Sequence, residues 1–413
     1  MNKKGFTLIE LLAVIVILAI IALIATPIVI GIIEDSKNSS QLRSAELYLK
    51  TVENAIGNEM LDGTKIDDRT YDIIEDGDLC KDYKDGECIN KIDVDVRGEV
   101  PKEGTIKIEK GNVKDLELMY DDVKIGKDSK GNLFKKEYEI GKEIIFNPGD
   151  QDWLWNVIDE EKDTITLMLS ENIGDTVDWY ESSENNHYGP ITALNYLNTL
   201  TSTTWTNVDI IENYSYVNNL NGTEKPNGYQ KLEIYNGRTT LTHKDGKTTL
   251  LDDVSRARFL TQEEILEIAS KTNKNFTKEN LRLYIKRNLD VINTVLSSEG
   301  LNTATTVDEV VEIVLGEYSK YESEHVLFCA TVAVLVYEVN IESTYNLLFP
   351  EYLYQNLSEN GDFYAYWTLS SDYAGSYSAS YFNYSGNFGG VSVHQGNGIG
   401  VRPVITISKT KLK

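Results

Sequence analysis

A single carboxylate stands inside a long apolar run at the start of this sequence. Glu10 lies in the run from Leu8 to Ile33 and is the only charged residue within that run. A carboxylate in a membrane helix costs about 2.5–3.5 kcal/mol at the bilayer centre and less near the interface, so an acid there indicates a function. The natural partner of Glu10 is an α-amino group on Phe6. Cleavage after Gly5 would expose that amine, in the same subunit or in a neighbouring one.

The apolar run around Glu10 predicts a membrane-spanning helix. It exceeds the roughly 20 residues that a helix needs to cross a bilayer, and we assign the span to residues 6–33. Lys3 and Lys4 precede it, and by the positive-inside rule they place the N-terminus on the cytoplasmic side. We therefore expect a single-pass protein of the cell membrane whose chain from Glu34 onward is extracytoplasmic and displayed at the cell surface.

The segment Gly5-Phe6-Thr7-Leu8-Ile9-Glu10-Leu11 resembles the N-terminal signal of type IV prepilins. The resemblance implies that a prepilin peptidase cuts after Gly5 and methylates the new first residue, Phe6. It implies that Glu10 sets the register between subunits in a filament. Pro27 stands where the family's spine helix carries a proline, which removes one backbone hydrogen bond and kinks the helix. The expected partners are the peptidase, the membrane and other pilin subunits.

Two plainer explanations of this N-terminus fit less well. A secretory signal peptide has an apolar core of about 7–15 residues, followed by a small-x-small cleavage site. Here the small residue Gly5 precedes the core, and the core is longer. A plain signal anchor needs neither Glu10 nor a glycine at the leader junction.

The spine helix is predicted to continue beyond the membrane and to pack on a sheet, which gives an α+β fold. Apolar residues recur there at three- and four-residue steps, as on an amphipathic helix; they are Leu42, Ala45, Tyr48, Leu49, Val52, Ala55 and Ile56. We divide the chain into a leader (1–5), the spine helix (6–60), an antiparallel sheet of three or four strands (61–138) and a C-terminal domain (139–413). Within the sheet region, the alternation over residues 92–96 predicts a strand. In the C-terminal domain, residues 153–158 and 164–169 predict a hairpin, and Thr261 with Glu264 three residues on predicts a capping box at the start of a helix. Residues 265–345 have roughly helical spacing and predict a helical insertion in that domain.

The C-terminal domain carries a second, shorter resemblance. Tyr366-Trp367-Thr368-Leu369-Ser370 and Gly400-Val401-Arg402-Pro403-Val404 are similar to the tail of domains related to formylglycine-generating enzymes. The resemblance covers roughly residues 140–264 and 346–408, and implies a C-type-lectin-like fold in which Arg402 is a buried structural arginine. Those enzymes use a pair of copper-binding cysteines, which this unit lacks. The resemblance therefore points to a non-catalytic binding domain.

The remaining chemistry of the sequence is sparse. Cys80 and Cys88 bracket a polar, turn-like stretch and could pair outside the cytoplasm, although free thiols are an open alternative. Cys329 lies in an apolar run and is expected in the core. The 4 histidines have no metal-ligand spacing, and we expect neither a metal nor a cofactor. With 40 basic and 65 acidic residues, the net charge of −25 argues against a nucleic-acid partner.

Aromatic residues gather near the C-terminus and allow two interpretations. They fill a core, or they form a recognition surface for a glycan or protein, since Tyr and Trp anchor interfaces. The candidate ligand contacts are Tyr364, Tyr366, Trp367, Tyr373, Tyr377, Tyr381 and Tyr384.

The sequence thus predicts a type IV pilin-like surface subunit that displays a non-catalytic adhesive domain on a pilus or pseudopilus. A pseudopilin of a type II secretion or DNA-uptake (competence) machine shares Gly5, Phe6 and Glu10, and it remains an open alternative. A membrane-tethered enzyme is a weaker one, because no nucleophile–base pair is visible.

Overall fold

The chain divides into two compact units. The computed structural model describes residues 8–64, 66–74, 76–84, 87–96, 98–121, 123–182, 185–218, 229–272, 351–358, 362–363, 365–371, 378–384, 388–394 and 398–412. Unit 1 comprises residues 1–66 and 70–136, and unit 2 comprises residues 67–69 and 137–413. We had placed this division after residue 138, two residues further along. Of the helical insertion predicted over 265–345, all but residues 265–272 lies outside the described part.

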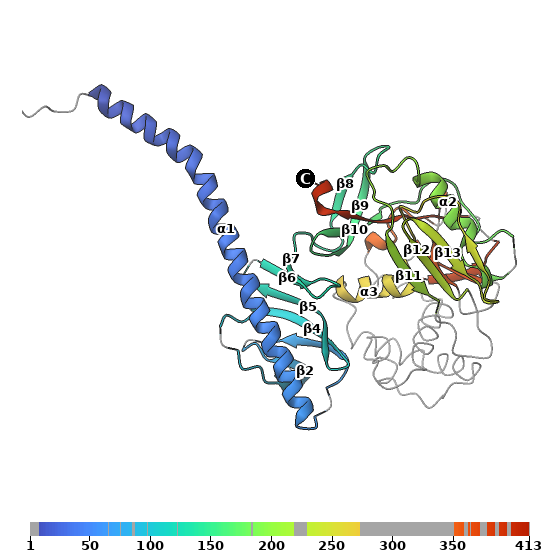
Figure 1. Ribbon diagram of the computed structural model, residues 1–413, viewed down its shortest axis with the longest axis horizontal. Coiled ribbons are helices and arrows are strands. Elements are labelled where there is room, and N and C mark those ends of the chain that lie inside the picture. Colours follow the sequence, from blue (N-terminus) through green and yellow to red (C-terminus); the bar gives the residue numbers. More distant parts are fainter. Residues whose placement is uncertain are drawn as a thin grey trace, which may run out of the picture. The chain divides into compact units, whose positions relative to one another are not determined.

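Unit 1 is built on one long helix, α1 (Leu8–Leu61), which contains Pro27 without ending there (Figure 1). Ala45, Tyr48, Val52 and Ile56 follow one another at steps of three or four residues, and all four are buried. They pack with the apolar residues of the adjoining sheet in one core. The end of α1 is fixed by Gly63, whose φ of 85° lies in the left-handed region that only glycine adopts without strain.

The sheet of unit 1 has seven strands. They are β1 (Arg69–Ile73), β2 (Leu79–Lys84), β3 (Glu87–Ile92), β4 (Glu103–Glu109), β5 (Asn112–Tyr120), β6 (Val123–Lys127) and β7 (Leu133–Lys135). Their order is β3-β2-β1-β4-β5-β6-β7, in which β1–β3 and β4–β7 form antiparallel runs. Side chains alternate along β4 and β5, and the buried ones face α1.

The predicted sheet of three or four strands was too small. The strands β2 and β3 are polar, and their register shifts twice, so they lack the clean alternation that marks a half-buried strand. We had also expected a strand over residues 92–96, whereas β3 ends at Ile92. Beyond it the Val94 N–H donates to the Asp78 carboxylate (2.8 Å) rather than to a neighbouring strand. A disulfide joins Cys80 of β2 to Cys88 of β3.

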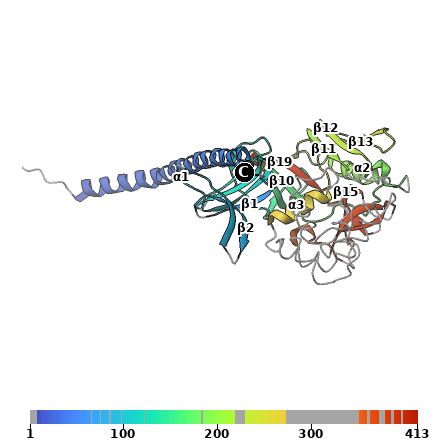
Figure 2. The same ribbon diagram turned by 90° about the horizontal axis from the view of Figure 1, so that it is seen from below.

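The described part of unit 2 contains three four-stranded sheets and short helices, with β11, β12 and β13 beside α2 (Figure 2). The first sheet, β19-β10-β9-β8, contains β8 (Glu143–Phe146), β9 (Trp153–Glu160), β10 (Thr164–Leu169) and β19 (Val404–Ser408). The second runs β11 (Asn213–Val217), β12 (Lys231–Tyr235), β13 (Arg238–Thr242) and β14 (Thr248–Leu250). The third, β17-β16-β15-β18, contains β15 (Ala365–Ser371), β16 (Ser378–Asn383), β17 (Phe388–Ser392) and β18 (Ile399–Gly400). The described helices are α2 (Ile191–Thr201), α3 (Gln262–Thr272), η1 (Asn186–Tyr188), η3 (Glu351–Leu353) and η4 (Lys409–Leu412).

The core of unit 2 is aromatic. Trp155, Trp179, Trp205 and Trp367 are all buried in one cluster, to which all three sheets and α2 contribute. The last strand, β19, returns from the chain end to pair with β10, as in Thr166 opposite Thr406. The predicted hairpin of β9 and β10 is confirmed. Over the described residues, strands outweigh helices, which confirms the α+β class.

Candidate functional site

The predicted processing site lies outside the described residues, since these begin at Leu8. Glu10 and Pro27 belong to the backbone of α1, but their side chains are not among the described ones. Within the described part of the chain, no helix is long and apolar enough to cross a membrane.

The structure corrects part of the predicted recognition surface. Tyr366 and Trp367 on β15 are buried, so neither can contact a ligand at the surface. Side chains alternate along a strand, and both faces of β15 are covered: Trp367 packs in the tryptophan cluster, and Tyr366 packs with Phe382 and Leu353 in another.

The other candidate tyrosines divide into two groups. Tyr381 and Tyr384 are half-buried, and the Tyr381 ring meets Trp367 edge-on at 6.4 Å. Tyr364, Tyr373 and Tyr377 lie outside the described residues.

Arg402 is buried, as the lectin-like resemblance implied. Its guanidinium donates to the backbone carbonyls of Leu353 (3.2 Å) and Gln355 (2.8 Å), and it lies 4.8 Å from the centre of the Tyr366 ring. Burial lowers the pKa of Arg402 to about 10, so the side chain stays charged at neutral pH. This residue organises the fold around η3 and does not face solvent.

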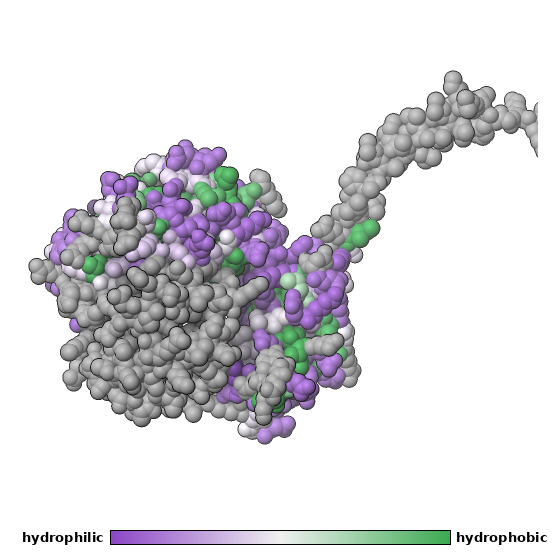
Figure 3. All heavy atoms as spheres, turned by 180° about the vertical axis from the view of Figure 1, so that it is seen from behind, coloured by the Kyte–Doolittle hydropathy of each residue, from purple (hydrophilic) through white to green (hydrophobic). Residues whose placement is uncertain are grey.

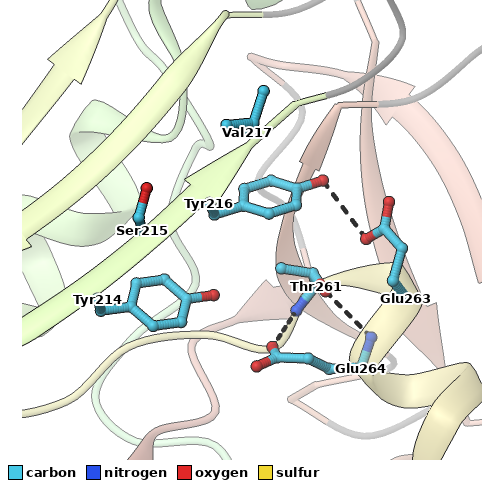
Figure 4. A pocket seen from close by; sticks show the side chains of 7 residues that line it. All are labelled: Tyr214, Ser215, Tyr216, Val217, Thr261, Glu263 and Glu264. Carbon is cyan, nitrogen blue, oxygen red and sulfur yellow. Dashed lines mark hydrogen bonds between the residues drawn. The ribbon is translucent and has the colours of Figure 1, made fainter. Parts of the chain in front are cut away.

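A different group of residues surrounds an open hollow of about 320 Å³ in unit 2. One wall is β11, through Tyr214, Ser215, Tyr216 and Val217, and the other is the start of α3 (Figure 4). Figure 4 shows the two tyrosine side chains extending from β11 toward α3. Alternation along the strand places them on one face. The volume lies at the lower end of the roughly 300–1,000 Å³ typical of small-molecule sites.

The wall formed by α3 is held by its first turn. Thr261 precedes the helix and accepts the Glu264 N–H at its hydroxyl (3.0 Å), while Glu264 accepts the Thr261 N–H (2.9 Å). This is the capping box predicted from the Thr261 to Glu264 spacing, and it satisfies two backbone donors reciprocally. Figure 4 shows these contacts beside Glu263, which lies on the same turn.

One of the two carboxylates in the hollow is neutralised. Glu264 binds Arg258 with both oxygens (2.7 and 2.8 Å). Burial by itself would lower the pKa of Arg258, but Glu264 outweighs this effect and raises it. The Arg258 guanidinium also covers the Tyr214 ring at 4.3 Å, and burial raises the pKa of the Tyr214 hydroxyl. The contacts with Arg258 therefore fix the positions of the Glu264 and Tyr214 side chains that line the hollow.

The second carboxylate, Glu263, takes part in a hydroxyl network. The Tyr216 hydroxyl lies 2.9 Å from the Ser370 hydroxyl, and both lie 3.5 Å from the Glu263 carboxylate. Ser370 is buried and also accepts the Gln262 N–H (3.1 Å). These contacts link β11, α3 and β15, so they hold polar groups in fixed positions, as a binding site requires.

The arrangement of this hollow is suited to binding. It offers oxygen acceptors and one carboxylate beyond the Arg258–Glu264 pair. Among the described residues no three His, Cys, Asp or Glu side chains could hold a metal together. The spacing of Thr261 and Glu264 predicts the capping box, but no local signal marks Tyr214 and Tyr216. Tyr214 contacts Arg258, and Tyr216 contacts Glu263 and Ser370, which are 47 and 154 residues away in the chain.

Comparison with known proteins identifies only the N-terminus. Residues 1–26 match the family model described as the prokaryotic N-terminal methylation motif. The chain therefore carries a type IV prepilin signal, which confirms the prediction made from Gly5, Phe6 and Glu10. Comparisons with curated proteins and with solved structures gave no match.

The match defines a class. It supports a type IV pilin-like or pseudopilin subunit, processed by a prepilin peptidase and assembled with other pilins. Such a signal indicates a membrane-anchored protein displayed at the surface.

Proposed function

We propose that this chain is inserted through its N-terminal helix into a pilus or pseudopilus, and that it displays unit 2 as a non-catalytic binding domain. The observation that carries the proposal is the methylation motif over residues 1–26. The 54-residue helix α1, whose second half packs on the sheet of unit 1, supports it. A spine helix joined to a compact head lets the helices of many subunits pack together while the heads stay outside.

Glu10 is proposed to act in assembly. In a lone subunit its carboxylate lies in an apolar helix without a charged partner from that run. When subunits pack, the methylated amine of Phe6 on a neighbour can neutralise it, which offsets the cost of the buried charge. The pair therefore favours one axial step between adjacent helices. Pro27 is proposed to kink the helix, as it removes one backbone hydrogen bond.

Unit 2 is proposed to be the part that meets partners of the assembled structure. Unit 2 is too large to be packed easily at every position of a filament. Its size therefore favours the role of a minor or tip subunit. The lectin-like resemblance remains part of this proposal, supported by the buried Arg402 and by the returning strand β19. An adhesive role follows if unit 2 binds a ligand without altering it.

Replacing Glu10 with alanine tests the assembly role. We expect Glu10→Ala to be cleaved normally and retained in the membrane, but to enter sheared filaments at least ten-fold less than the wild type. Glu34→Ala is the matched control, since it removes a carboxylate at the far end of the same apolar run. Mass spectrometry of the mature protein should show Phe6 first and one methyl group heavier. Normal incorporation of Glu10→Ala, or a retained Met1, would contradict the proposal.

A pseudopilin would be processed in the same way as a pilin. The two roles are distinguished by the structure into which the chain assembles. Electron microscopy of cells expressing the chain should show long filaments labelled by an antibody against unit 2 if the chain serves in a pilus. Label confined to the envelope, together with loss of secretion or of DNA uptake on deletion, would favour the pseudopilus.

A further inference from the structure

One edge of strand β11 carries backbone groups that none of the described strands pairs with. Among the described strands β11 pairs with β12 alone. The Asn218 N–H donates to Gln230 (3.1 Å), and the Asn236 N–H donates to Glu212 (2.9 Å). Hydrogen-bonded pairs alternate along an antiparallel ladder, so residues 212, 214, 216 and 218 bond to β12. The N–H and C=O groups of Ser215 and Val217 therefore point the other way.

These outward groups border the hollow described above. Ser215 and Val217 both line it, Ser215 is exposed, and Val217 is 43 % exposed. Residues two apart on a strand repeat at about 6.6–6.8 Å, the spacing of the donors and acceptors in any extended peptide. The edge of β11 beside the hollow therefore presents the donors and acceptors with which one more strand can pair.

The edge lacks the features by which proteins block strand pairing. Such edges commonly carry lysine or other charges, proline, or a bulge. The sequence of β11 is Asn-Tyr-Ser-Tyr-Val, and its register with β12 is unbroken. Among other edge strands, β8 begins with Glu143 and β3 contains Glu87 and Lys91. Strand β11 is therefore open to pairing in a way that these two are not.

The charge beside the edge favours a basic partner. Glu263 lines the hollow, and the Tyr216 and Ser370 hydroxyls lie 3.5 Å from its carboxylate. Further from the site, the chain as a whole carries a net charge of −25, and the coloured residues in Figure 3 are mainly hydrophilic. A lysine or arginine side chain would donate a charge-assisted hydrogen bond to the Glu263 carboxylate.

We propose that β11 binds an extended peptide segment as an added strand, with a lysine or arginine of that segment meeting Glu263. A glycan fits less well, because the tyrosine rings are already in contact: Arg258 covers Tyr214, and Tyr216 meets Tyr229 at 6.2 Å. The inference deepens the display role proposed for unit 2. Peptide binding and filament incorporation are measured separately, so either can fail alone.

Synthetic peptides test this on the full-length protein in detergent. The probe is fluorescein-labelled Thr-Val-Lys-Val-Thr with blocked ends, followed by fluorescence anisotropy. We expect saturable binding, at least ten-fold weaker binding when Glu replaces the central Lys, and none when the outward-bonding amides are N-methylated. Glu263→Gln should remove the preference for Lys over Glu.

Two proline variants locate the contact. Ser215→Pro removes an outward N–H without touching the β12 ladder and should abolish binding. Thr248→Pro is the matched control: the Leu251 N–H bonds to Thr239, so Thr248 likewise points outward, from the opposite edge strand β14. It should bind as the wild type does. Binding that survives Ser215→Pro or N-methylation would overturn the proposal. So would the absence of binding by both the Lys peptide and its Arg analogue, or a dimer through β11 that Ser215→Pro dissolves.

Discussion

Replacing Arg402 with methionine should strongly destabilise the part of unit 2 around η3, although methionine fills a similar volume. The guanidinium is buried, and it donates to the carbonyls of Leu353 and Gln355 at 3.2 and 2.8 Å and to the Asn172 side chain at 3.4 Å. Each buried carbonyl that loses its donor costs about 1–3 kcal/mol. The lost contact with the Tyr366 ring adds about 1 kcal/mol. Removing the buried charge offsets part of this, which leaves a net loss of about 3–5 kcal/mol.

The loss should be local to η3 and the residues after it. Hydrogen exchange followed by mass spectrometry measures opening segment by segment, which suits a chain of two units whose unfolding is not one two-state transition. Exchange over residues 351–358 should accelerate by a factor of 100 or more in Arg402→Met, because 1.4 kcal/mol corresponds to a factor of ten. Arg402→Lys should give a smaller loss, since an ammonium cannot reproduce the planar fork. Exposed Arg238 supplies the control, and Arg238→Met should change stability by less than about 0.5 kcal/mol. If Arg402→Met exchanges as the wild type does, the arginine does not hold η3 in place.

Three further predictions follow from the described contacts. The disulfide between Cys80 and Cys88, eight residues apart, should appear as one cross-linked peptide in non-reducing digests, and its reduction should cost about 2–3 kcal/mol; two alkylatable thiols in protein from the cell surface would contradict it. Burial opposes ionisation of Asp78, but hydrogen bonds from Lys91 (2.7 Å) and a backbone N–H outweigh it and lower the pKa of Asp78 below its ordinary value of 3.8. A depressed carboxyl pKa stabilises above the unfolded value, so unit 1 should lose stability as pH falls below about 4, and Asp78→Asn should flatten that loss in a urea titration. Trp367→Ala should cost about 3–5 kcal/mol, seen as a lower melting temperature of unit 2; an unchanged melting temperature would return this residue to the list of surface contacts.

Local sequence signals predicted well those features that depend on neighbours in the chain. The prepilin signal is a contiguous motif, and comparison confirms it. The capping box of Thr261 and Glu264 spans four residues, and the β9–β10 hairpin spans seventeen. In each case the interacting groups are close in sequence, so residue type and spacing are enough to define them.

Hydrophobic alternation predicted strands less well where a strand is exposed to solvent or carries polar residues on both faces. The sheet of unit 1 has seven strands rather than three or four, because β2 and β3 interrupt their alternation with register shifts. Val94 lies in an alternating apolar pattern, yet its N–H bonds to a side chain of Asp78. Hydrophobic alternation alone cannot tell a strand from an extended loop whose backbone is satisfied by a carboxylate.

What the sequence by itself determined is how the chain is processed: the leader, the cleavage and methylation signal, and the acid at Glu10. What only the tertiary structure decided is which aromatic residues are buried and which polar groups meet. Tyr366 and Trp367 belong to a tyrosine-rich stretch that is compatible with a surface, but the helices and strands packed on both faces of β15 bury them. The hollow between β11 and α3 likewise depends on contacts between Tyr216, Glu263 and Ser370, which lie far apart in the chain. Burial and open strand edges are properties of packed elements, and a linear pattern does not contain them.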